Sequence, residues 1–206
     1  MPHAIKCRCG SLTGTVIETS GGNHGICYCL DCQAFAHVLG SPESILDARG
    51  GTEIVQTSPQ NIVFTEGVQN LACLRLTANG LMRWYAACCN TPIGNTSANY
   101  RVSVVGLVHS CLRSGQSSLD EAFGAPTMRV YTKYAKGEPK PGTTGLLATI
   151  PRLARMIVGA RITGRYRSTP FFAEASGAPV ATPRILSAEE RAEVMGAVNR
   201  ASARPV

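Results

Sequence analysis

Cysteines in three short groups are the residues of this 206-residue chain best suited to chemistry. Seven of the nine cysteines belong to these groups: Cys7 and Cys9 in "KCRCG", Cys27, Cys29 and Cys32 in "CYCLDCQ", and the adjacent Cys88 and Cys89 in "AACCNTP". Thiolates hold Zn²⁺ in a tetrahedron, and they commonly come in close pairs from turns, with a distant pair completing the site. The grouping therefore predicts bound Zn²⁺, at one or two sites per chain.

The start of the sequence, "MPHAIKCRCG", lacks the apolar run and small-residue cleavage site of a secretory signal, so we expect a cytoplasmic protein. Disulfides do not persist in a reducing compartment, which favours metal binding or redox chemistry for clustered thiols. Cys29 and Cys32 have the spacing of a redox pair. Cys27 beside them, and the absence of a clear βαβ pattern after them, favour metal binding instead.

The order of the cysteine motifs resembles one known family. "CRCG", then "CYCLDCQ", then "RWYAACCNTPI" is similar to the pattern of the glutathione-dependent formaldehyde-activating enzyme family, whose domain also occurs in centromere protein V. The resemblance covers about residues 5 to 95. It implies a zinc-binding β-tent fold of packed antiparallel sheets with two zinc sites. By this resemblance Cys7, Cys9 and Cys89 hold a structural zinc, while Cys27, Cys29 and Cys32 hold a second zinc with one open position.

One position departs from the family pattern. When Tyr85, Cys89 and Pro92 are aligned with it, Ala86 stands where the first late cysteine belongs, and Asn90 replaces a glycine. We predict that Cys88 supplies the missing ligand, although two adjacent thiolates on one metal strain the backbone between them. The alternatives are three thiolates completed by water or a histidine, or no structural zinc.

The charge of the middle group indicates its chemistry. Three thiolates on Zn²⁺ give a net charge of −1, which makes a strongly acidic bound water, and therefore hydrolysis, unfavourable. A thiol from outside can instead lose its proton and add to a carbonyl carbon. Cys27, Cys29 and Cys32 are thus our candidate catalytic residues in a carbon–sulfur lyase, and glutathione as the thiol rests on the resemblance alone.

A non-catalytic zinc-stabilised module that binds a protein, nucleic acid or membrane is the alternative function. The two functions differ at the fourth zinc position, which His24 or His37 could close, although we expect both histidines to lie outside the ligand set. The net charge of +7 is concentrated in residues 145–206, which hold nine Arg and four Glu. This excess suits several anionic partners equally and gives no clear sign of nucleic-acid binding.

Two arginines and two isolated cysteines are expected to lie outside the metal sites. Arg83 and Arg101 could meet the carboxylates of glutathione, but we expect both to be solvated surface residues. Cys73 and Cys111 stand alone in apolar patterns and are predicted to be small buried hydrophobes. Trp84 is predicted to pack in the core.

The elements that position these residues are predicted to be mainly β. Hydrophobic residues make up 44% and charged residues 16% of the chain, and 21 Gly and 12 Pro indicate many turns. Strand patterns occur at "SLTGTVIET", "TEIVQ", "NIVF", "LACLRLT" and "LMRWYAA", and Asn79-Gly80 joins the last two as a hairpin. We expect a meandering antiparallel sheet. The apolar run "RVSVVGLVHSCL" is too short to cross a bilayer.

A boundary near residue 140 is predicted from the Lys-, Pro- and Gly-rich "YTKYAKGEPKPGTTG". It divides the chain into a zinc-binding domain, 1–140, and a basic, partly helical extension, 141–206. A first helix should place Leu146, Ile150, Leu153 and Ile157 on one face, docked on the domain, on a partner or on a membrane, with Arg152 and Arg155 opposite. Pro151 should start or kink this helix. A second helix is expected after Ser187, with Glu190 completing a capping box.

Overall fold

The computed structural model describes residues 2–112 and 117–202. A small antiparallel sheet has the order β1-β2-β5, with β1 His3–Lys6, β2 Thr13–Val16 and β5 Ile62–Glu66. A larger sheet has the order β10 Met128–Val130, β3 Asn23–Cys27, β4 Thr52–Thr57, β9 Val105–Val108, β8 Thr91–Thr96, β7 Met82–Ala86, β6 Leu71–Arg75 and β11 Arg184–Ile185.

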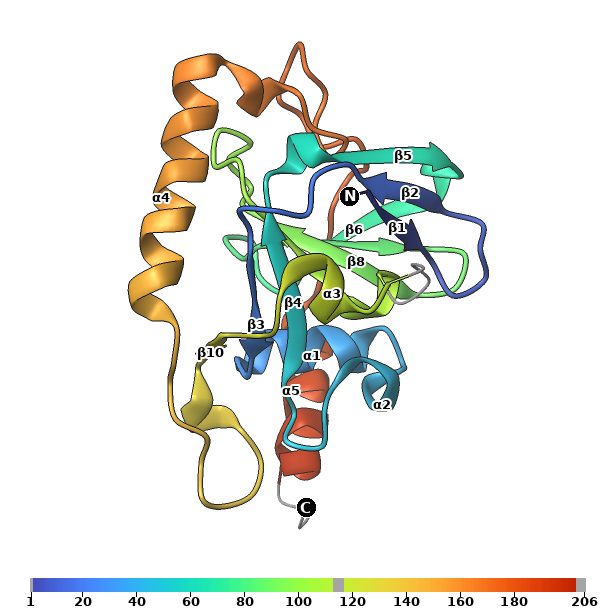
Figure 1. Cartoon of the computed structure of the whole chain (residues 1–206). Coiled ribbons are helices and arrows are strands. Elements are labelled where there is room, and N and C mark those ends of the chain that lie inside the picture. The colour runs from blue at the N-terminus through green and yellow to red at the C-terminus, as the bar shows by residue number, and fades with distance from the viewer. Residues whose placement is uncertain (1, 113–116, 203–206) are drawn as a thin grey trace.

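The helices lie around these sheets (Figure 1). They are α1 Leu30–Val38, α2 Pro42–Ile45, α3 Leu119–Phe123, α4 Leu146–Thr163 and α5 Ala188–Ser202. Short 3₁₀ turns are η1 Pro59–Asn61, η2 Val68–Asn70, η3 His109–Cys111, η4 Thr132–Tyr134 and η5 Arg165–Arg167. The prediction of a mainly β fold with a C-terminal helical extension is confirmed.

The prediction of a simple antiparallel meander is wrong at both edges of the larger sheet. β10 pairs with β3 in parallel, and β11 pairs with β6 in parallel. Both edge strands arrive through long connections, which is the kind of crossover that parallel pairing requires. The five predicted strand segments correspond to β4, β6 and β7 of the larger sheet and to β2 and β5 of the smaller one, whereas β3 and β8 were missed. The β6–β7 hairpin closes at Gly80, whose N–H donates to the Thr77 carbonyl at 3.0 Å.

The main core lies between the sheets and includes a segment from the C-terminal third of the chain. Trp84 is fully buried, and its ring centroid lies 5.2 Å from that of Phe171 and 5.9 Å from that of Phe172. Its indole N–H donates to Thr96 Oγ1 at 2.9 Å, so the buried polar atom is satisfied. Trp84 therefore packs in the core as predicted. The division of the chain at residue 140 stays a prediction.

The two C-terminal helices form as expected, with one difference. Ser187 and Glu190 make the predicted capping box, with N–H···O distances of 2.8 and 3.1 Å, and α5 packs against α1. In α4, however, Leu146 and Ile150 are exposed, so the predicted apolar face does not dock on the domain at these residues, and its docking on a partner or a membrane stays a prediction. The fully buried residues of α4 are Thr149 and Ala160, because small side chains let the helix approach the body closely. Pro151 lies within the continuous helix.

Candidate functional site

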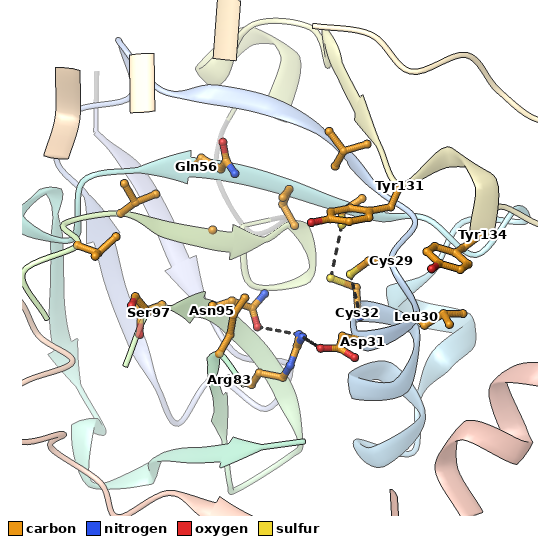
Figure 2. A pocket seen from close by; sticks show the side chains of 18 residues that line it. Cys29, Leu30, Asp31, Cys32, Gln56, Arg83, Asn95, Ser97, Tyr131 and Tyr134 are labelled. Carbon is orange, nitrogen blue, oxygen red and sulfur yellow. Dashed lines mark hydrogen bonds and ion pairs between the residues drawn. The ribbon is translucent and has the colours of Figure 1, made fainter. Parts of the chain in front are cut away.

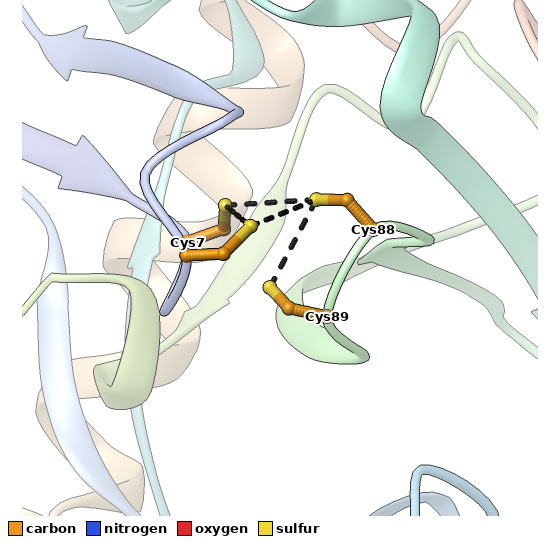
Figure 3. Close-up of side chains that lie close together, drawn as sticks. Cys7, Cys88 and Cys89 are labelled. Atoms are coloured by element: carbon orange, nitrogen blue, oxygen red, sulfur yellow. Dashed lines mark hydrogen bonds between the residues drawn. The ribbon is translucent and has the colours of Figure 1, made fainter.

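The first and last cysteine groups meet in one four-cysteine cluster, made by Cys7, Cys9, Cys88 and Cys89 (Figure 3). The Sγ atom of Cys88 lies 3.8 Å from that of Cys7, 3.3 Å from that of Cys9 and 3.9 Å from that of Cys89. All four sulfur atoms lie within 4.8 Å of one another. Four sulfurs at about 2.3 Å from one ion would stand about 3.8 Å apart, so the cluster could hold a metal ion.

Two turns bring these cysteines together. Cys7 and Cys9 follow β1, while Cys88 and Cys89 lie in the turn between β7 and β8. Arg8 joins the two turns, because its backbone N–H donates to Thr91 Oγ1 at 2.9 Å and its guanidinium donates to the Cys89 carbonyl at 2.8 Å. The contacts fix the two cysteine pairs against each other.

The structure places Cys88, not position 86, among the other three sulfurs. Ala86 is fully buried at the end of β7, where it pairs with Leu71 and Thr91. Asn90, which follows the cysteine pair, has a left-handed backbone with φ of 55°. Asn tolerates this conformation better than most residues, and it lets the turn reverse directly after two adjacent cysteines.

The local environment favours the thiolate form of some cysteines in this cluster. Hydrogen bonds from Ser11, and then from Cys88 and Cys7, lower the pKa of Cys9 to about 6. Burial and hydrogen bonds with Cys9 and Cys7 raise the pKa of Cys88 to about 12. Burial also acts to raise the pKa of Cys89, but hydrogen bonds, chiefly from Thr91 and the Cys9 backbone, outweigh it, so that this pKa is lowered too. Negative charge is thus favoured on sulfurs that lie close together, which is a suitable environment for a cation.

The middle group forms a separate cysteine triad, Cys27, Cys29 and Cys32. Cys27 ends β3, Cys29 is the N-cap of α1, and Cys32 lies in the first turn of that helix. The Cys29 sulfur accepts the Cys32 backbone N–H at 3.3 Å, and the Cys32 and Cys27 sulfurs are 3.8 Å apart. The three sulfurs lie within 4.8 Å of one another and could therefore hold a metal ion. A strand-to-helix turn thus positions the whole triad.

Arg83 supports this triad from the floor of the site, and the expectation that it is a solvated surface residue is wrong. Its side chain is 1% exposed, and its guanidinium lies 3.5 Å from Asp31 Oδ2 and donates to Asn95 Oδ1 at 3.2 Å. Hydrogen bonds from Cys27 and Cys29, together with the charge of Arg83, hold the pKa of Cys32 well below its usual range. Arg83 is buried because α1 lies over this part of β7, with Asp31 and the Phe35 ring against the guanidinium, and there it can neutralise a thiolate.

A cavity of about 580 Å³ opens beside the triad (Figure 2). All three triad cysteines line it, together with Arg83, Asn95, Gln56, Tyr131 and Tyr134 among others. Figure 2 shows Tyr131 over the cysteines, across the site from Arg83. Tyr131 has φ of 57°, an uncommon backbone conformation for a bulky side chain, and such strain occurs often at functional sites.

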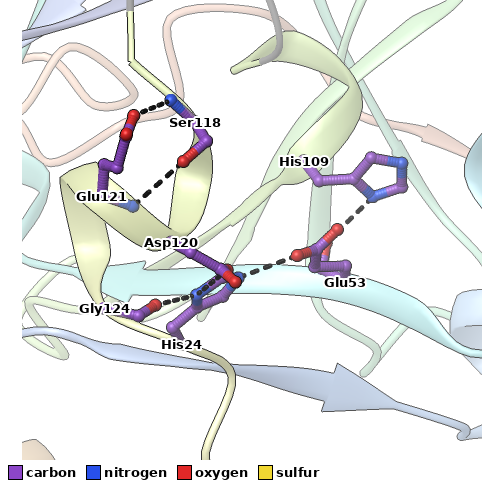
Figure 4. Close-up of polar contacts among 7 residues, drawn as sticks. All are labelled: His24, Glu53, His109, Ser118, Asp120, Glu121 and Gly124. Atoms are coloured by element: carbon purple, nitrogen blue, oxygen red, sulfur yellow. Dashed lines mark hydrogen bonds and ion pairs between the residues drawn. The ribbon is translucent and has the colours of Figure 1, made fainter.

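His24 does not belong to the triad, because it points to the other face of the sheet. Side chains alternate along a strand, so His24 and Cys27 face opposite sides of β3. His24 Nδ1 donates to the Gly124 carbonyl at 2.5 Å, and Nε2 lies 3.0 Å from a Glu53 carboxylate oxygen (Figure 4). Burial lowers the pKa of His24, but the hydrogen bonds with Glu53 and Gly124 and the charges of Glu53 and Asp120 together outweigh it, so the net direction is upward.

His24, Glu53 and Asp120 also lie close enough to hold a metal ion. Both ring nitrogens of His24 already face hydrogen-bond acceptors, and a nitrogen that donates a hydrogen bond has no lone pair for a metal ion. These contacts therefore favour a structural role, in which His24 holds the loop after α3 against the sheet. His37 lies in the last turn of α1, and burial and the charge of Lys136 lower its pKa. Among the described residues, the group of ligands at the triad contains only the three cysteines.

The two isolated cysteines and Arg101 lie outside both cysteine groups. Cys73 and Cys111 are buried as predicted, and burial raises the pKa of each to about 12. Arg101 is exposed beside Tyr100, with its guanidinium 5.9 Å from the ring centroid, as expected for a surface residue. Sequence reasoning missed Asp31, Tyr131 and Tyr134 as residues of the site. Asp31 lies inside the "CYCLDCQ" motif, so its place next to Cys32 was an available signal, whereas no cysteine motif contains the two tyrosines.

None of the described helices combines the length and apolar character needed to cross a membrane. Residues 2–183 match a sequence family described as "Family of unknown function (DUF6151)". No curated protein matches the chain.

Proposed function

We propose that this chain, which belongs to the DUF6151 family of unknown function, is a zinc-dependent carbon–sulfur lyase that acts at the cysteine triad. One observation carries the proposal: three sulfurs converge at the wall of a cavity of about 580 Å³, and the described residues around them supply no fourth metal ligand. Catalytic zinc sites keep one position for water or substrate, whereas structural sites are closed by four protein ligands.

Zinc suits both groups of cysteines. Thiolates favour Zn²⁺ among common divalent ions, and the sulfur separations in the four-cysteine cluster match a tetrahedral site. We propose a structural zinc held by Cys7, Cys9, Cys88 and Cys89, and a second zinc held by Cys27, Cys29 and Cys32. The second zinc would supply a positive charge that favours the thiolate form of an incoming thiol.

The residues around the triad would balance charge and hold the substrate. Arg83 offsets the negative charge of the thiolates, and Asp31 in turn orients the guanidinium. Tyr131 lines the same cavity as the cysteines and is 59% exposed, so its ring would form an outer part of the wall against which a ligand packs. Asn95 and Gln56 offer amide groups to polar atoms of a ligand in the cavity.

The proposed reaction is the addition of a thiol to an aldehyde and its reverse. The thiol loses its proton, its sulfur forms a bond to the carbonyl carbon, and the carbonyl oxygen gains a proton, giving an S-hydroxyalkyl adduct. The reverse direction breaks the carbon–sulfur bond and returns thiol and aldehyde. Glutathione and formaldehyde are proposed as the reactants from the resemblance of the cysteine motifs to the formaldehyde-activating family.

Cobalt substitution tests the proposal, because Co²⁺ in a thiolate site has an absorption spectrum that reports its ligands. Glutathione added to the Co²⁺ protein should change the spectrum, and Cys29→Ser should abolish that change while the spectrum of the four-cysteine cluster remains. Exchange between formaldehyde, glutathione and S-hydroxymethylglutathione should accelerate with the Zn²⁺ protein and not with Cys29→Ser. A spectrum insensitive to any thiol would instead support the non-catalytic zinc-stabilised module.

A further inference from the structure

Helix α4 carries a continuous stripe of exposed apolar residues that the proposed reaction does not use. Leu147 is 94% exposed and Ile162 is 81% exposed, with Ile150 and Val158 also exposed between them. Together with Ala154 these residues recur at steps of three or four, so they lie along one face of the helix. At 1.5 Å per residue the stripe is about 22 Å long.

The stripe faces away from the rest of the protein. Figure 1 shows α4 along the outside of the molecule, with its packing mainly against η5 and its buried residues on the opposite side. Isolated exposed apolar residues are ordinary, but an aligned row of this length indicates an interaction surface.

The charges around the stripe indicate the kind of surface that it meets. α4 contains Arg152, Arg155 and Arg161 and no acidic residue. At 100° per residue, Arg155 and Arg161 lie on the two sides of the stripe. Both also reach toward the body, since Arg161 Nε donates to the Arg101 carbonyl at 3.4 Å in an exposed hydrogen bond and Arg155 borders a groove between α4 and the body. Arg152, Arg155 and Arg165 line this groove of about 500 Å³, where Glu18 is the acidic residue of the lining. The charge excess along the helix is therefore positive.

We propose that α4 seats the protein on an anionic lipid surface. The apolar stripe would enter the boundary between headgroups and acyl chains, while the flanking guanidinium groups would remain at the level of the phosphates, as long basic side chains do at interfaces. A second copy of this chain is a poorer occupant. Two α4 helices packed stripe to stripe would bring arginines together without a carboxylate on either helix to pair with them.

Vesicle sedimentation with the full chain tests the proposal. Vesicles of phosphatidylcholine with phosphatidylglycerol should bind the protein at low salt, and vesicles of phosphatidylcholine alone should bind it weakly. Leu147→Ser combined with Ile162→Ser should lower the partition coefficient about tenfold or more, since the two most exposed apolar side chains of the stripe are lost. Arg155→Gln combined with Arg161→Gln should remove most of the dependence on anionic lipid.

The control is Val68→Ser, which removes an exposed apolar side chain from η2 and should leave vesicle binding unchanged. Thermal melts and metal content of every variant separate loss of binding from loss of fold. Equal binding of the Leu147/Ile162 variant and the parent protein, or no binding to anionic vesicles at low salt, would overturn the proposal. It would also fail if the parent were a dimer that the same variant converts to a monomer, because the stripe would then be an interface between copies. None of these readouts depends on lyase activity.

Discussion

The four-cysteine cluster and the cysteine triad use the same ligand atom but join very different lengths of chain. Cys7 and Cys88 are 81 positions apart, so the cluster ties the turn after β1 to the turn between β7 and β8. In the triad, Cys27 and Cys32 are five positions apart within one strand-to-helix turn. A cross-link that closes a long loop constrains the unfolded chain more than one that closes a short loop.

The two groups also differ in the number of sulfurs and in their surroundings. The four-cysteine cluster has a complete set of four sulfurs, with Cys9 and Cys88 exposed at its edge. The triad has three sulfurs, a buried arginine on one side and a cavity on another. Four thiols that join distant turns suit a metal site that stabilises the fold. Three thiols within one turn, beside a cavity, suit a metal site that binds and activates a substrate. Each prediction below tests a part of this contrast.

The largest effect is expected from breaking the long-range cluster. Cys7→Ser should abolish binding of the proposed zinc between the two turns and lower the free energy of unfolding by several kcal/mol, because binding at a closed zinc site contributes directly to folding. For a chain of this size that is a fall in Tm of about 10 °C or more, measurable by calorimetry. Cys9→Ser is the matched variant: Cys9 is exposed, so a similar fall there reports lost metal binding rather than lost packing.

Cys29→Ser should have a much smaller effect on stability and a clear effect on metal content. The triad joins only neighbouring residues, so its loss leaves the β1 to β7–β8 connection intact. We expect the zinc content to fall from two to one per chain, with Tm changed by about 3 °C or less. Elemental analysis and a thermal melt on the same sample give both values. Equal destabilisation by Cys7→Ser and Cys29→Ser would contradict the division between the two groups.

Arg83→Met should weaken metal binding at the triad alone. The charge of Arg83 stabilises the Cys32 thiolate, and residues that support metal ligands commonly change affinity by about 10- to 100-fold. Chelator competition should therefore release one metal ion more readily while the four-cysteine cluster keeps its own. Asp31→Asn is the control for the lost ion pair, since it keeps the guanidinium beside Cys32 and should change metal affinity less. Equal weakening at both groups would show that Arg83 acts only through general stability.

Sequence reasoning was most successful where the determinants are local. The spacing of Cys27, Cys29 and Cys32 lies within one turn, and the capping box of Ser187 and Glu190 lies within four residues, so both could be recognised directly. The grouping of Cys7 and Cys9 with the late pair was available only from a resemblance to another family, because spacing alone does not say which distant turns meet. Cys88 was predicted as the replacement ligand from its place two residues after Ala86, and the register that buries Ala86 at the end of β7 agrees with that prediction.

The remaining features depend on tertiary packing. Arg83 looked like a surface residue because a lone arginine in a strand pattern carries no sign of its burial, and only the position of α1 over β7 places it beside Cys32 and over the Phe35 ring. Parallel pairing of β10 with β3 brings Tyr131 to the pocket from about a hundred residues away. Neither effect follows from periodicity, since both result from which elements become neighbours.

Tyr131 allows the smallest but most selective test of the contrast. Its left-handed backbone costs of order 1 kcal/mol, a cost that glycine avoids, while glycine also has more conformational freedom to lose on folding. Tyr131→Gly should therefore change stability by about 1 kcal/mol or less. It also removes a ring from the wall of the triad cavity and should weaken the thiol-dependent change in the Co²⁺ spectrum. Tyr131→Phe keeps the ring, so retained thiol binding with slower adduct exchange would assign the hydroxyl a role in holding or moving a proton at the substrate oxygen. If Tyr131→Gly instead loses the metal from both cysteine groups, the strained residue supports the fold rather than the pocket, and the contrast between a stabilising cluster and a chemical one would not extend to it.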